Sequence, residues 1–326
     1  MSKSENPSSA AEPVVLVLQP IAPSALDRLR TKSDVALAFG AKAVAVEEVL
    51  HRVSGIVTRN APIPSGLFDQ APKLRGIARV GVGTDHIDLK AATARRVPVA
   101  ITPEANYQAV AEHTFALILA VQRRIVTADT IVRRGRFHER DTLGGQSLHG
   151  TCLGVVGYGR VGREVARIAS SGFGMEVTVH DPFLRDLPAG VMSVQNLDDL
   201  LAVADVVSLH VPLTPETRGL IGAGALSRMK RSTILINTAR GAVVDAAALI
   251  DALRAERLAG AGIDVYDEPP GADSPLVTLK NVVLTPHVAA MTEQAFVRMS
   301  EEAVDAILAL LADRRPNGVV NERVWR

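Results

Sequence analysis

The chain has 326 residues, of which 47% are apolar and 22% are charged. This length favours two domains, and this ordinary globular composition excludes a small binding module and global disorder. The net charge is +1 and there is no long basic block, so we expect no nucleic-acid partner. No apolar run is longer than Phe115 to Val121, which is far shorter than the ~20 residues that cross a bilayer, so we expect no membrane partner.

The N-terminal segment, residues 1–12, is polar and rich in Ser, Glu and Pro. It predicts a disordered tail and no signal peptide. The single cysteine, Cys152, permits no internal disulfide and no cysteine-based zinc site, and its apolar neighbours predict a small core residue. These features predict a cytoplasmic protein without a metal site.

Short β-branched runs alternate with helical stretches up to residue 108, which predicts βαβ units in a parallel sheet. Helices are expected over 24–30, with Ser24 as the N-cap, and over 89–95. The expected strands are 14–18, 35–39, 55–58, 76–80 and 97–101.

A long periodic stretch, 109–134, predicts one helix that links two domains. A helix is also expected over 292–311, followed by a short strand over 318–320. Between these helices the alternation restarts, with strands expected at 152–156, 177–179, 206–209, 233–236, 262–264 and 282–284. The predicted fold class is therefore α/β, with two doubly wound parallel-sheet domains.

A glycine-rich loop follows the strand expected at 152–156. Gly157, Gly159 and Gly162 form a Gly-x-Gly-x-x-Gly sequence that opens a helix. The first glycine permits a tight turn, the second admits a pyrophosphate, and the third lets the helix pack against the strand. The pattern alone is a weak signal, but its position between a strand and a helix predicts a dinucleotide site.

Asp181 follows the next expected strand. Its spacing from the glycines is close to the ~20 residues at which a carboxylate meets an adenosine ribose 2′-OH. Because a carboxylate repels a 2′-phosphate, NAD is predicted over NADP. Two alternatives stay open: Asp181, followed by Pro182, only starts a turn, or the nearby Arg185 accommodates NADP.

Three later strands lead into Arg240, Glu268 and His287. Carboxyl ends of parallel strands share one edge of a sheet, so these side chains are expected to converge. A guanidinium binds a carboxylate bidentately, an imidazolium gives a proton to a ketone oxygen, and a carboxylate favours the charged imidazole. The set predicts chemistry on a 2-oxo acid, although each residue alone could be structural.

In the first domain, the loop after the strand expected at 76–80 contains Val82 and Gly83. Their backbone N–H groups are predicted to bind a substrate carboxylate. His113, near the start of the linking helix, is expected to be structural.

The motifs GYGRVG (157–162), HVPLTPETRG (210–219), INTARG (236–241), DVY (264–266) and TPHV (285–288) resemble those of a known family. The chain is similar to the D-isomer-specific 2-hydroxyacid dehydrogenases, in particular the phosphoglycerate dehydrogenase-like members, over about residues 14–320. The resemblance implies a flavodoxin-like catalytic domain (13–108 plus 292–326), a Rossmann NAD-binding domain (109–291), an active site in the cleft between them, and a homodimer.

The resemblance also implies roles for single residues. Arg240 would hold the substrate carboxylate, His287 would be the acid/base, and Glu268 would be its partner. Arg59 and Asn106 match positions near the substrate. The implied cofactor contacts, besides the glycines, come from Arg160, Val161, Asp181, Val211, Thr238, Ala239, Asp264 and Ala290.

One departure from the family pattern concerns the partner of His287. Asp264 and Glu268 are one residue closer in sequence than is common in the family, which leaves Asp267 as an alternative partner.

The sequence therefore predicts an NAD-dependent D-2-hydroxyacid dehydrogenase acting on a small anionic acid. 3-Phosphoglycerate is the first candidate, because Arg59 suits a second anionic group. Glyoxylate or hydroxypyruvate reduction is the alternative if Arg59 is only a surface residue, and an NAD-sensing corepressor-like scaffold is a less favoured one. The chain ends soon after the last expected helix, so no regulatory domain and no serine feedback are expected.

Overall fold

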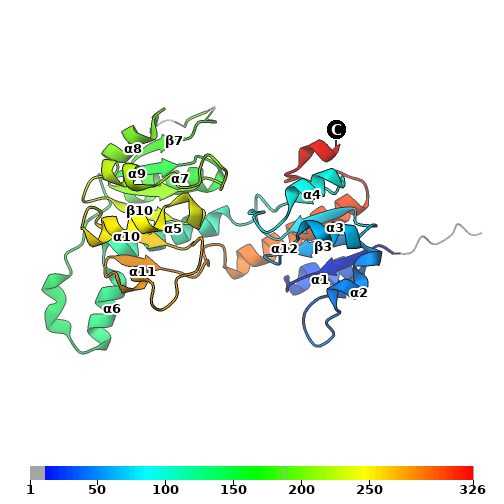
Figure 1. Cartoon of the computed structure of the whole chain (residues 1–326). Helices are drawn as coiled ribbons and strands as arrows, with labels where there is room; N and C mark the ends of the chain where they lie inside the picture. Colours follow the sequence, from blue (N-terminus) through cyan, green and yellow to red (C-terminus); the bar gives the residue numbers. More distant parts are fainter. Residues whose placement is uncertain (1–11, 185, 189, 326) are drawn as a thin grey trace, which may run out of the picture. The chain divides into compact units, whose positions relative to one another are not determined.

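The computed structural model describes residues 12–184, 186–188 and 190–325. The tail expected over 1–12 therefore lies outside the described residues, apart from Glu12. The chain divides into two compact units, each described here by itself. Unit 1 comprises Met1–Asn106 and Thr292–Arg326, and unit 2 comprises Tyr107–Met291. In Figure 1, unit 1 contains the blue and red ends of the colour scale, and unit 2 contains the green and yellow middle.

Unit 1 is built on a five-stranded parallel sheet with the order β2-β1-β3-β4-β5. Its strands are β1 (Val14–Val17), β2 (Asp34–Leu37), β3 (Val53–Thr58), β4 (Gly76–Arg79) and β5 (Val99–Ala100). Its helices are α1 (Pro23–Arg30), α2 (Val46–Val49), η1 (Leu50–Arg52), α3 (Ser65–Gln70), α4 (Leu89–Ala94), α12 (Glu293–Leu311) and η4 (Glu322–Trp325).

Helix α12 joins this unit although it lies far along the sequence from the sheet. It packs on β3 and β4, and glycines on these strands make the approach possible. A Cβ at Gly55 would lie 3.0 Å from the Ile307 side chain, and one at Gly76 would lie 2.6 Å from that of Leu310. Unit 1 is therefore discontinuous in sequence.

Unit 2 is built on a seven-stranded parallel sheet with the order β12-β11-β10-β9-β6-β7-β8. Its strands are β6 (Cys152–Val156), β7 (Glu176–His180), β8 (Val191–Ser193), β9 (Val206–Leu209), β10 (Ile234–Asn237), β11 (Gly260–Ile263) and β12 (Val282–Leu284). Its helices are α5 (Tyr107–Gln122), α6 (Ile125–Arg133), η2 (Phe137–Thr142), α7 (Arg160–Phe173), α8 (Leu197–Val203), α9 (Ala223–Arg228), η3 (Gly241–Val243), α10 (Ala246–Arg254) and α11 (Pro275–Thr278).

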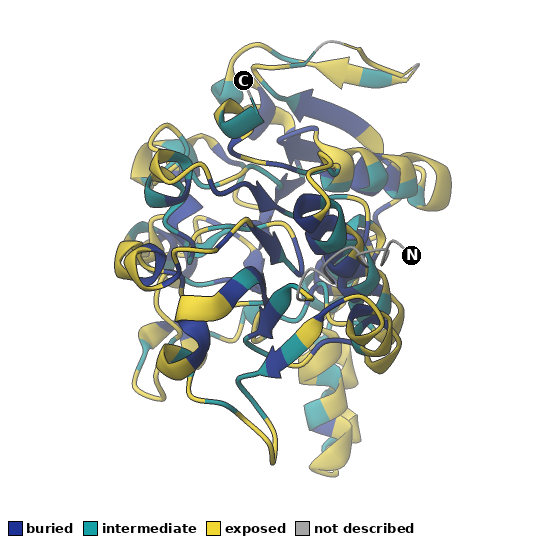
Figure 2. Cartoon of the chain, turned by 90° about the vertical axis from the view of Figure 1, so that its right-hand side faces the viewer, coloured by how far each residue is buried: buried dark blue, intermediate teal, exposed yellow. Residues whose placement is uncertain are grey.

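Both sheets have the order of doubly wound folds, which confirms the predicted fold class. In each sheet the first strand in sequence is an internal one. The later strands are added first on one side of it and then on the other, so that the strand order reverses between β1 and β3 in unit 1 and between β6 and β9 in unit 2. Figure 2 shows strands largely in the dark blue of buried residues, with yellow exposed residues on the helices. In such sheets, ligands bind beyond the carboxyl ends of the strands at the point of reversal.

The structure corrects the helix expected over 109–134. Two helices, α5 and α6, replace it, because Arg124 adopts a left-handed backbone conformation with φ of 50°. No glycine or proline marks this break, so the apolar periodicity runs through it.

Four smaller expectations were also wrong. Ser24 is not an N-cap, since Ala22 has that position before Pro23, and the Ser24 hydroxyl instead donates to Glu301 Oε1 at 3.3 Å. Residues 318–320 form only an isolated bridge, between Val319 and Ala100. Cys152 is half-buried, because it is the first residue of the internal strand β6. Strand β8 was not predicted, because two of its three residues are exposed and it lacks an apolar run.

In the part of the chain that the structure describes, no helix combines the length and apolar character that a membrane span requires. The same residues contain no cluster of His, Cys, Asp or Glu that could hold a metal ion.

Candidate functional site

The glycine loop lies between β6 and α7, at the point of reversal of the unit 2 sheet. Gly157 has φ of 91°, and a Cβ there would lie 2.8 Å from the carbonyl group of His210. A Cβ at Gly162 would collide with the Gly157 carbonyl oxygen. Only glycine fits these two positions, and together they bring the start of α7 against the end of β6.

Gly159 is different, because its surroundings are open. A Cβ there would meet no atom within 4 Å, and among the described residues no side chain caps the N-terminus of α7. Arg160 and Val161 are the first residues of this helix, and Val211 lies beside the loop, its Cγ1 within 2.9 Å of a Cβ at Gly157. An uncapped helix start with free space suits a phosphate, so the loop fits a dinucleotide.

Asp181 contacts the glycine loop directly. Its Oδ2 accepts a hydrogen bond from the Tyr158 backbone N–H at 2.7 Å, and its Oδ1 accepts one from the Phe183 N–H at 2.9 Å. The second bond makes Asp181 the start of a turn, as one alternative expected. The first places the carboxylate beside the loop, as the dinucleotide prediction requires. Arg185 lies outside the described residues.

The loops that follow β10, β11 and β12 meet at one edge of the unit 2 sheet. The register pairs Asn237 with Ile263 and Ile263 with Leu284, so the three strands end side by side. A Cβ at Gly241 would collide with the Tyr266–Asp267 peptide. The Arg240 loop and the Asp264–Glu268 loop are therefore in backbone contact.

Asp264 ties the third loop to the second. Its side chain is 0% exposed, and its carboxylate accepts hydrogen bonds from Thr285 Oγ1 at 2.6 Å, Val288 N at 2.9 Å and Ala289 N at 3.0 Å. Burial acts to raise the pKa of Asp264, but the hydrogen bonds that it accepts outweigh burial and hold this pKa below its ordinary value. The carboxylate is therefore charged and built into the frame of the loop.

His287 lies within this fixed loop. Its backbone N–H donates to the Asp264 carbonyl at 2.8 Å, its φ is 57°, and its side chain is exposed. Ala290 follows as a partly buried residue at the end of the same loop. A left-handed conformation is uncommon outside glycine and requires support from neighbouring groups.

The loop of Arg240 is ordered by its own polar groups. Asn237 accepts the Ala239 N–H at 3.0 Å and donates to the Arg240 carbonyl at 2.9 Å, while Arg240 Nη1 donates to the Ala239 carbonyl at 2.6 Å. The Thr238 hydroxyl lies 3.1 Å from that of Thr114 on α5. This anchoring holds Thr238 and Ala239 at the end of β10.

The two candidate partners of His287 are both exposed. Glu268 and Asp267 follow β11 in a loop on the surface of the unit, and Asp267 Oδ2 lies 3.8 Å from Arg218 Nη1. Asp267 is therefore paired with the Arg218 guanidinium, whereas Glu268 forms no ion pair with any described residue. The choice between them remains a prediction.

In unit 1 the predicted substrate residues follow β3 and β4. The Arg59 guanidinium lies over the Phe296 ring, 5.1 Å from its centroid. Val82 is 43% exposed, and within the described chain neither its N–H nor that of Gly83 donates a hydrogen bond. Asn106 is buried, with 9% of its surface exposed, at the end of the unit.

Two polar residues near these sites were not predicted to act there. Gln19 Oε1 accepts hydrogen bonds from the backbone N–H groups of Arg59, Asn60 and Ala61, at 3.1, 2.6 and 2.8 Å. His113 contacts the Asp264 cluster. The polar Gln19 directly after a buried strand was the available signal for the first. A histidine one turn inside an apolar helix was the signal for the second.

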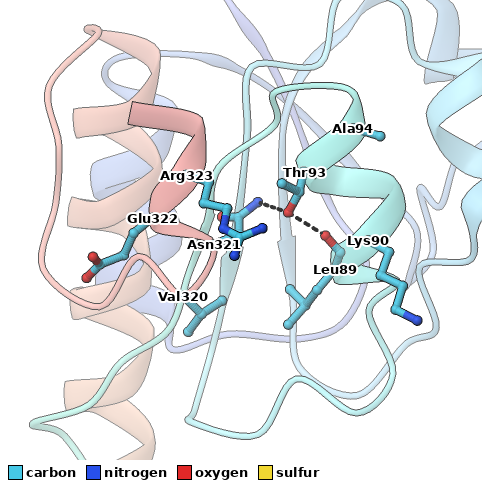
Figure 3. A pocket seen from close by; sticks show the side chains of 8 residues that line it. All are labelled: Leu89, Lys90, Thr93, Ala94, Val320, Asn321, Glu322 and Arg323. Carbon is cyan, nitrogen blue, oxygen red and sulfur yellow. Dashed lines mark hydrogen bonds between the residues drawn. The ribbon is translucent and has the colours of Figure 1, made fainter. Parts of the chain in front are cut away.

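A pocket of about 820 Å³ in unit 1 is lined by none of the site residues described above. Figure 3 shows it between α4 and the C-terminal segment, with Asn321 at its floor. Asn321 is fully engaged, accepting the Val99 N–H and donating to the Val97 carbonyl and to Thr93 Oγ1. These bonds fasten the C-terminal segment to the edge of the sheet, which is a structural role.

Comparison with known proteins gives the family. The model of the D-isomer-specific 2-hydroxyacid dehydrogenase NAD-binding domain matches residues 115–289, more than half of the chain. The chain belongs to this family. The predicted resemblance is thereby confirmed, and with it the presence of an NAD-binding domain.

Similar proteins carry different names. D-3-phosphoglycerate dehydrogenase of Mycobacterium tuberculosis is 39% identical over 96% of this chain, which spans only 61% of that protein. Glyoxylate reductase of Korarchaeum cryptofilum is 42% identical over 87% of each chain. The solved NADPH-dependent glyoxylate/hydroxypyruvate reductase of Sinorhizobium meliloti, in complex with NADP and malonate, is 30% identical, with a TM-score of 0.86 over 96% of this chain and 98% of that one.

Proposed function

We propose that this chain is an NAD-dependent D-2-hydroxyacid dehydrogenase, which transfers a hydride between NAD(H) and a small anionic 2-hydroxy or 2-oxo acid. The observation that carries the proposal is the edge of the unit 2 sheet. There the buried Asp264 carboxylate holds the loop of His287, and Gly241 brings the loop of Arg240 against the Tyr266–Asp267 peptide. Family membership adds the cofactor domain on the same sheet.

In this proposal NAD supplies or accepts the hydride when bound. The glycine loop and Asp181 hold its adenosine and pyrophosphate part, and the loops after β9 to β12 hold the rest. The residues proposed to hold NAD are Gly157, Gly159, Arg160, Val161, Gly162, Asp181, Val211, Thr238, Ala239, Asp264 and Ala290.

The chain's own residues supply binding and proton transfer. Arg240 binds the substrate carboxylate through its guanidinium fork, since two parallel N–H groups match two carboxylate oxygens. In the reducing direction, His287 donates a proton from its imidazolium to the ketone oxygen, and in the oxidising direction it accepts the proton back. Glu268 favours the charged imidazole, with Asp267 as the alternative.

For the substrate, we propose 3-phosphoglycerate first. Val82 and Gly83 offer to a carboxylate two N–H groups that no other described residue uses. Asn106 lies in the same unit, and Arg59 supplies a cation for a second anionic group. Glyoxylate or hydroxypyruvate is the second candidate, because similar proteins carry that activity in their names.

The test is to mix the protein with NADH and each member of a panel of 2-oxo acids. Oxidation of NADH is measured as the fall in absorbance of the reduced nicotinamide. Phosphohydroxypyruvate, hydroxypyruvate and glyoxylate separate the candidates, and pyruvate, which lacks both the phosphate and the hydroxyl group, serves as the control. Turnover of phosphohydroxypyruvate far above the others supports the first candidate. NADH binding without turnover of any member would contradict the enzyme proposal and favour a sensing scaffold.

The preference for NAD is tested at Asp181. Replacement by Ser keeps a small polar group but removes the charge that repels a 2′-phosphate. We expect weaker use of NADH and better use of NADPH, measured as the ratio of kcat/KM for the two cofactors. An unchanged ratio would contradict the role of Asp181.

We also propose a homodimer in the cytoplasm. Figure 1 shows α6 extending away from the unit 2 sheet, and this helix and η2 expose four large apolar side chains, Ile125, Val126, Val132 and Phe137, each more than half exposed. Such a patch on a projecting helix suits a second copy of the chain. Phe137→Asp should therefore lower the molar mass measured by light scattering, whereas Phe183→Asp, at a still more exposed site outside the patch, should not.

A further inference from the structure

His113 has no role in the proposed reaction so far, yet it lies beside the loop of His287. It comes from α5, and its side chain is 20% exposed. Its Nε2 lies 3.0 Å from Thr285 Oγ1 and 3.5 Å from Asp264 Oδ1. Both of these partners belong to the loops that carry the proposed active-site residues.

The direction of the hydrogen bonds follows from the donors available. An ionised carboxylate only accepts, so the 2.6 Å contact between Thr285 Oγ1 and Asp264 Oδ1 uses the hydroxyl hydrogen of Thr285. The Thr285 oxygen is then free only as an acceptor toward His113. Nε2 of His113 must therefore carry a hydrogen and donate it.

Asp264 connects His113 to the loop of His287 through hydrogen bonds. Its carboxylate holds the N–H groups of Val288 and Ala289, and its carbonyl holds that of His287. His287 is at a φ of 57°, which costs energy for a residue with a Cβ and persists only when the surroundings impose it. A donor beside the Asp264 carboxylate stabilises the charge on which this loop depends.

We propose that His113 is a positioning residue for the reaction: its Nε2–H, acting through Thr285 and Asp264, fixes the loop that presents His287. The inference rests on the proposed function, because it assumes that His287 performs the proton transfer. It replaces the expectation from sequence that His113 only supports the helix.

The experiment compares two amides of nearly equal chemistry, His113→Gln and His113→Asn. The Gln amide nitrogen reaches about as far as Nε2, whereas that of Asn reaches only as far as Nδ1. We expect Gln to retain most of the wild-type kcat and Asn to lose up to roughly tenfold, the upper end of what one hydrogen bond contributes. The KM for NADH should stay close to wild type in both, because both variants keep the Asp264 carboxylate and every other residue proposed to hold NAD.

A double-mutant cycle with Thr285→Val distinguishes a positioning role of His113 from a role in packing alone. Because His113 is proposed to act through Thr285, the double variant His113→Asn/Thr285→Val should be no slower than the slower of its two single variants. Thermal unfolding of every variant is measured alongside, and His51→Asn, at an exposed histidine in unit 1, is the control that should match wild type.

The outcomes are distinguishable. Equal kcat for the Gln and Asn variants, or additive losses in the cycle, overturns the inference. His287→Gln is measured in the same series: if it keeps wild-type turnover, the proposed function itself fails. If His287→Gln is inactive while His113→Asn has wild-type kcat, the proposed function stands and the role of His113 does not.

Discussion

The two units present their site loops in opposite ways. In unit 2, the loops after β10 to β12 are locked together, with the Asp264 carboxylate 0% exposed and bonded to a hydroxyl and two backbone N–H groups. In unit 1, the loop after β4 leaves the N–H groups of Val82 and Gly83 unused by other described residues. The first arrangement is closed and the second is open.

This difference matches what each proposed step requires. Proton transfer to a carbonyl oxygen works only over a narrow range of geometry, which a locked loop supplies. Recognition of the rest of the substrate requires donors that are free to receive it. Changes in the locked loop of His287 should therefore act mainly on kcat, and changes in the open loops of unit 1 should act mainly on KM and on the choice of substrate.

The largest effect is expected at His287. His287→Gln keeps a polar side chain but removes the acid/base, so kcat should fall by roughly 10²- to 10⁴-fold, the usual contribution of a positioned general acid. NADH affinity, measured by fluorescence titration, should change little. A variant within a few-fold of wild-type kcat would show that the locked loop does not carry the proton transfer.

Arg59 tests the open side. Arg59→Ala should raise KM for phosphohydroxypyruvate by roughly ten- to a hundredfold, because it removes a charge-assisted contact of about 1.5–3 kcal/mol. The KM for glyoxylate, which has one carboxylate, should barely move. The rise in KM for phosphohydroxypyruvate should also become smaller as the salt concentration increases. Equal losses for both substrates would mean that Arg59, stacked on Phe296, supports the loop, and the glyoxylate or hydroxypyruvate reductase proposal would then take first place.

Prediction from sequence succeeded where the signal was local and failed where it depended on residues far apart in the chain. In unit 2, strands with apolar runs and a glycine loop with fixed spacing are local signals, so β6, β9 and β12 agree with prediction residue by residue. The break at Arg124 was missed because no residue there forbids a helix, and the left-handed turn depends on tertiary packing. His113 and Gln19 were missed for a related reason: their partners, Thr285 and Arg59, are far along the chain, and only the folded sheet brings them together.

Asp264, besides its proposed contact with the cofactor, should contribute to stability. Asp264→Asn leaves an amide donor facing backbone N–H groups, which should lower the free energy of unfolding by about 1–3 kcal/mol at neutral pH. Because the pKa of Asp264 is lowered in the folded state, its contribution is present above the unfolded pKa of about 3.9 and is lost as pH falls through the lower folded pKa. The difference in Tm between wild type and variant should therefore narrow below about pH 4. A difference independent of pH would contradict the ionised, hydrogen-bonded carboxylate.

The smallest effect is expected at the partner of His287, and it decides between two neighbouring carboxylates. Glu268 and Asp267 are both exposed, so water screens either one and the effect should stay under about 1 kcal/mol, less than one pH unit. Loss of the true partner removes a charge that favours the imidazolium, so the pH at which 2-oxo acid reduction declines should move down. Glu268→Gln should give this shift, and Asp267→Asn should not, because Asp267 lies near Arg218. The reverse pattern in the two pH–rate profiles would assign the role to Asp267, and no shift in either would mean that the locked loop alone sets the protonation of His287.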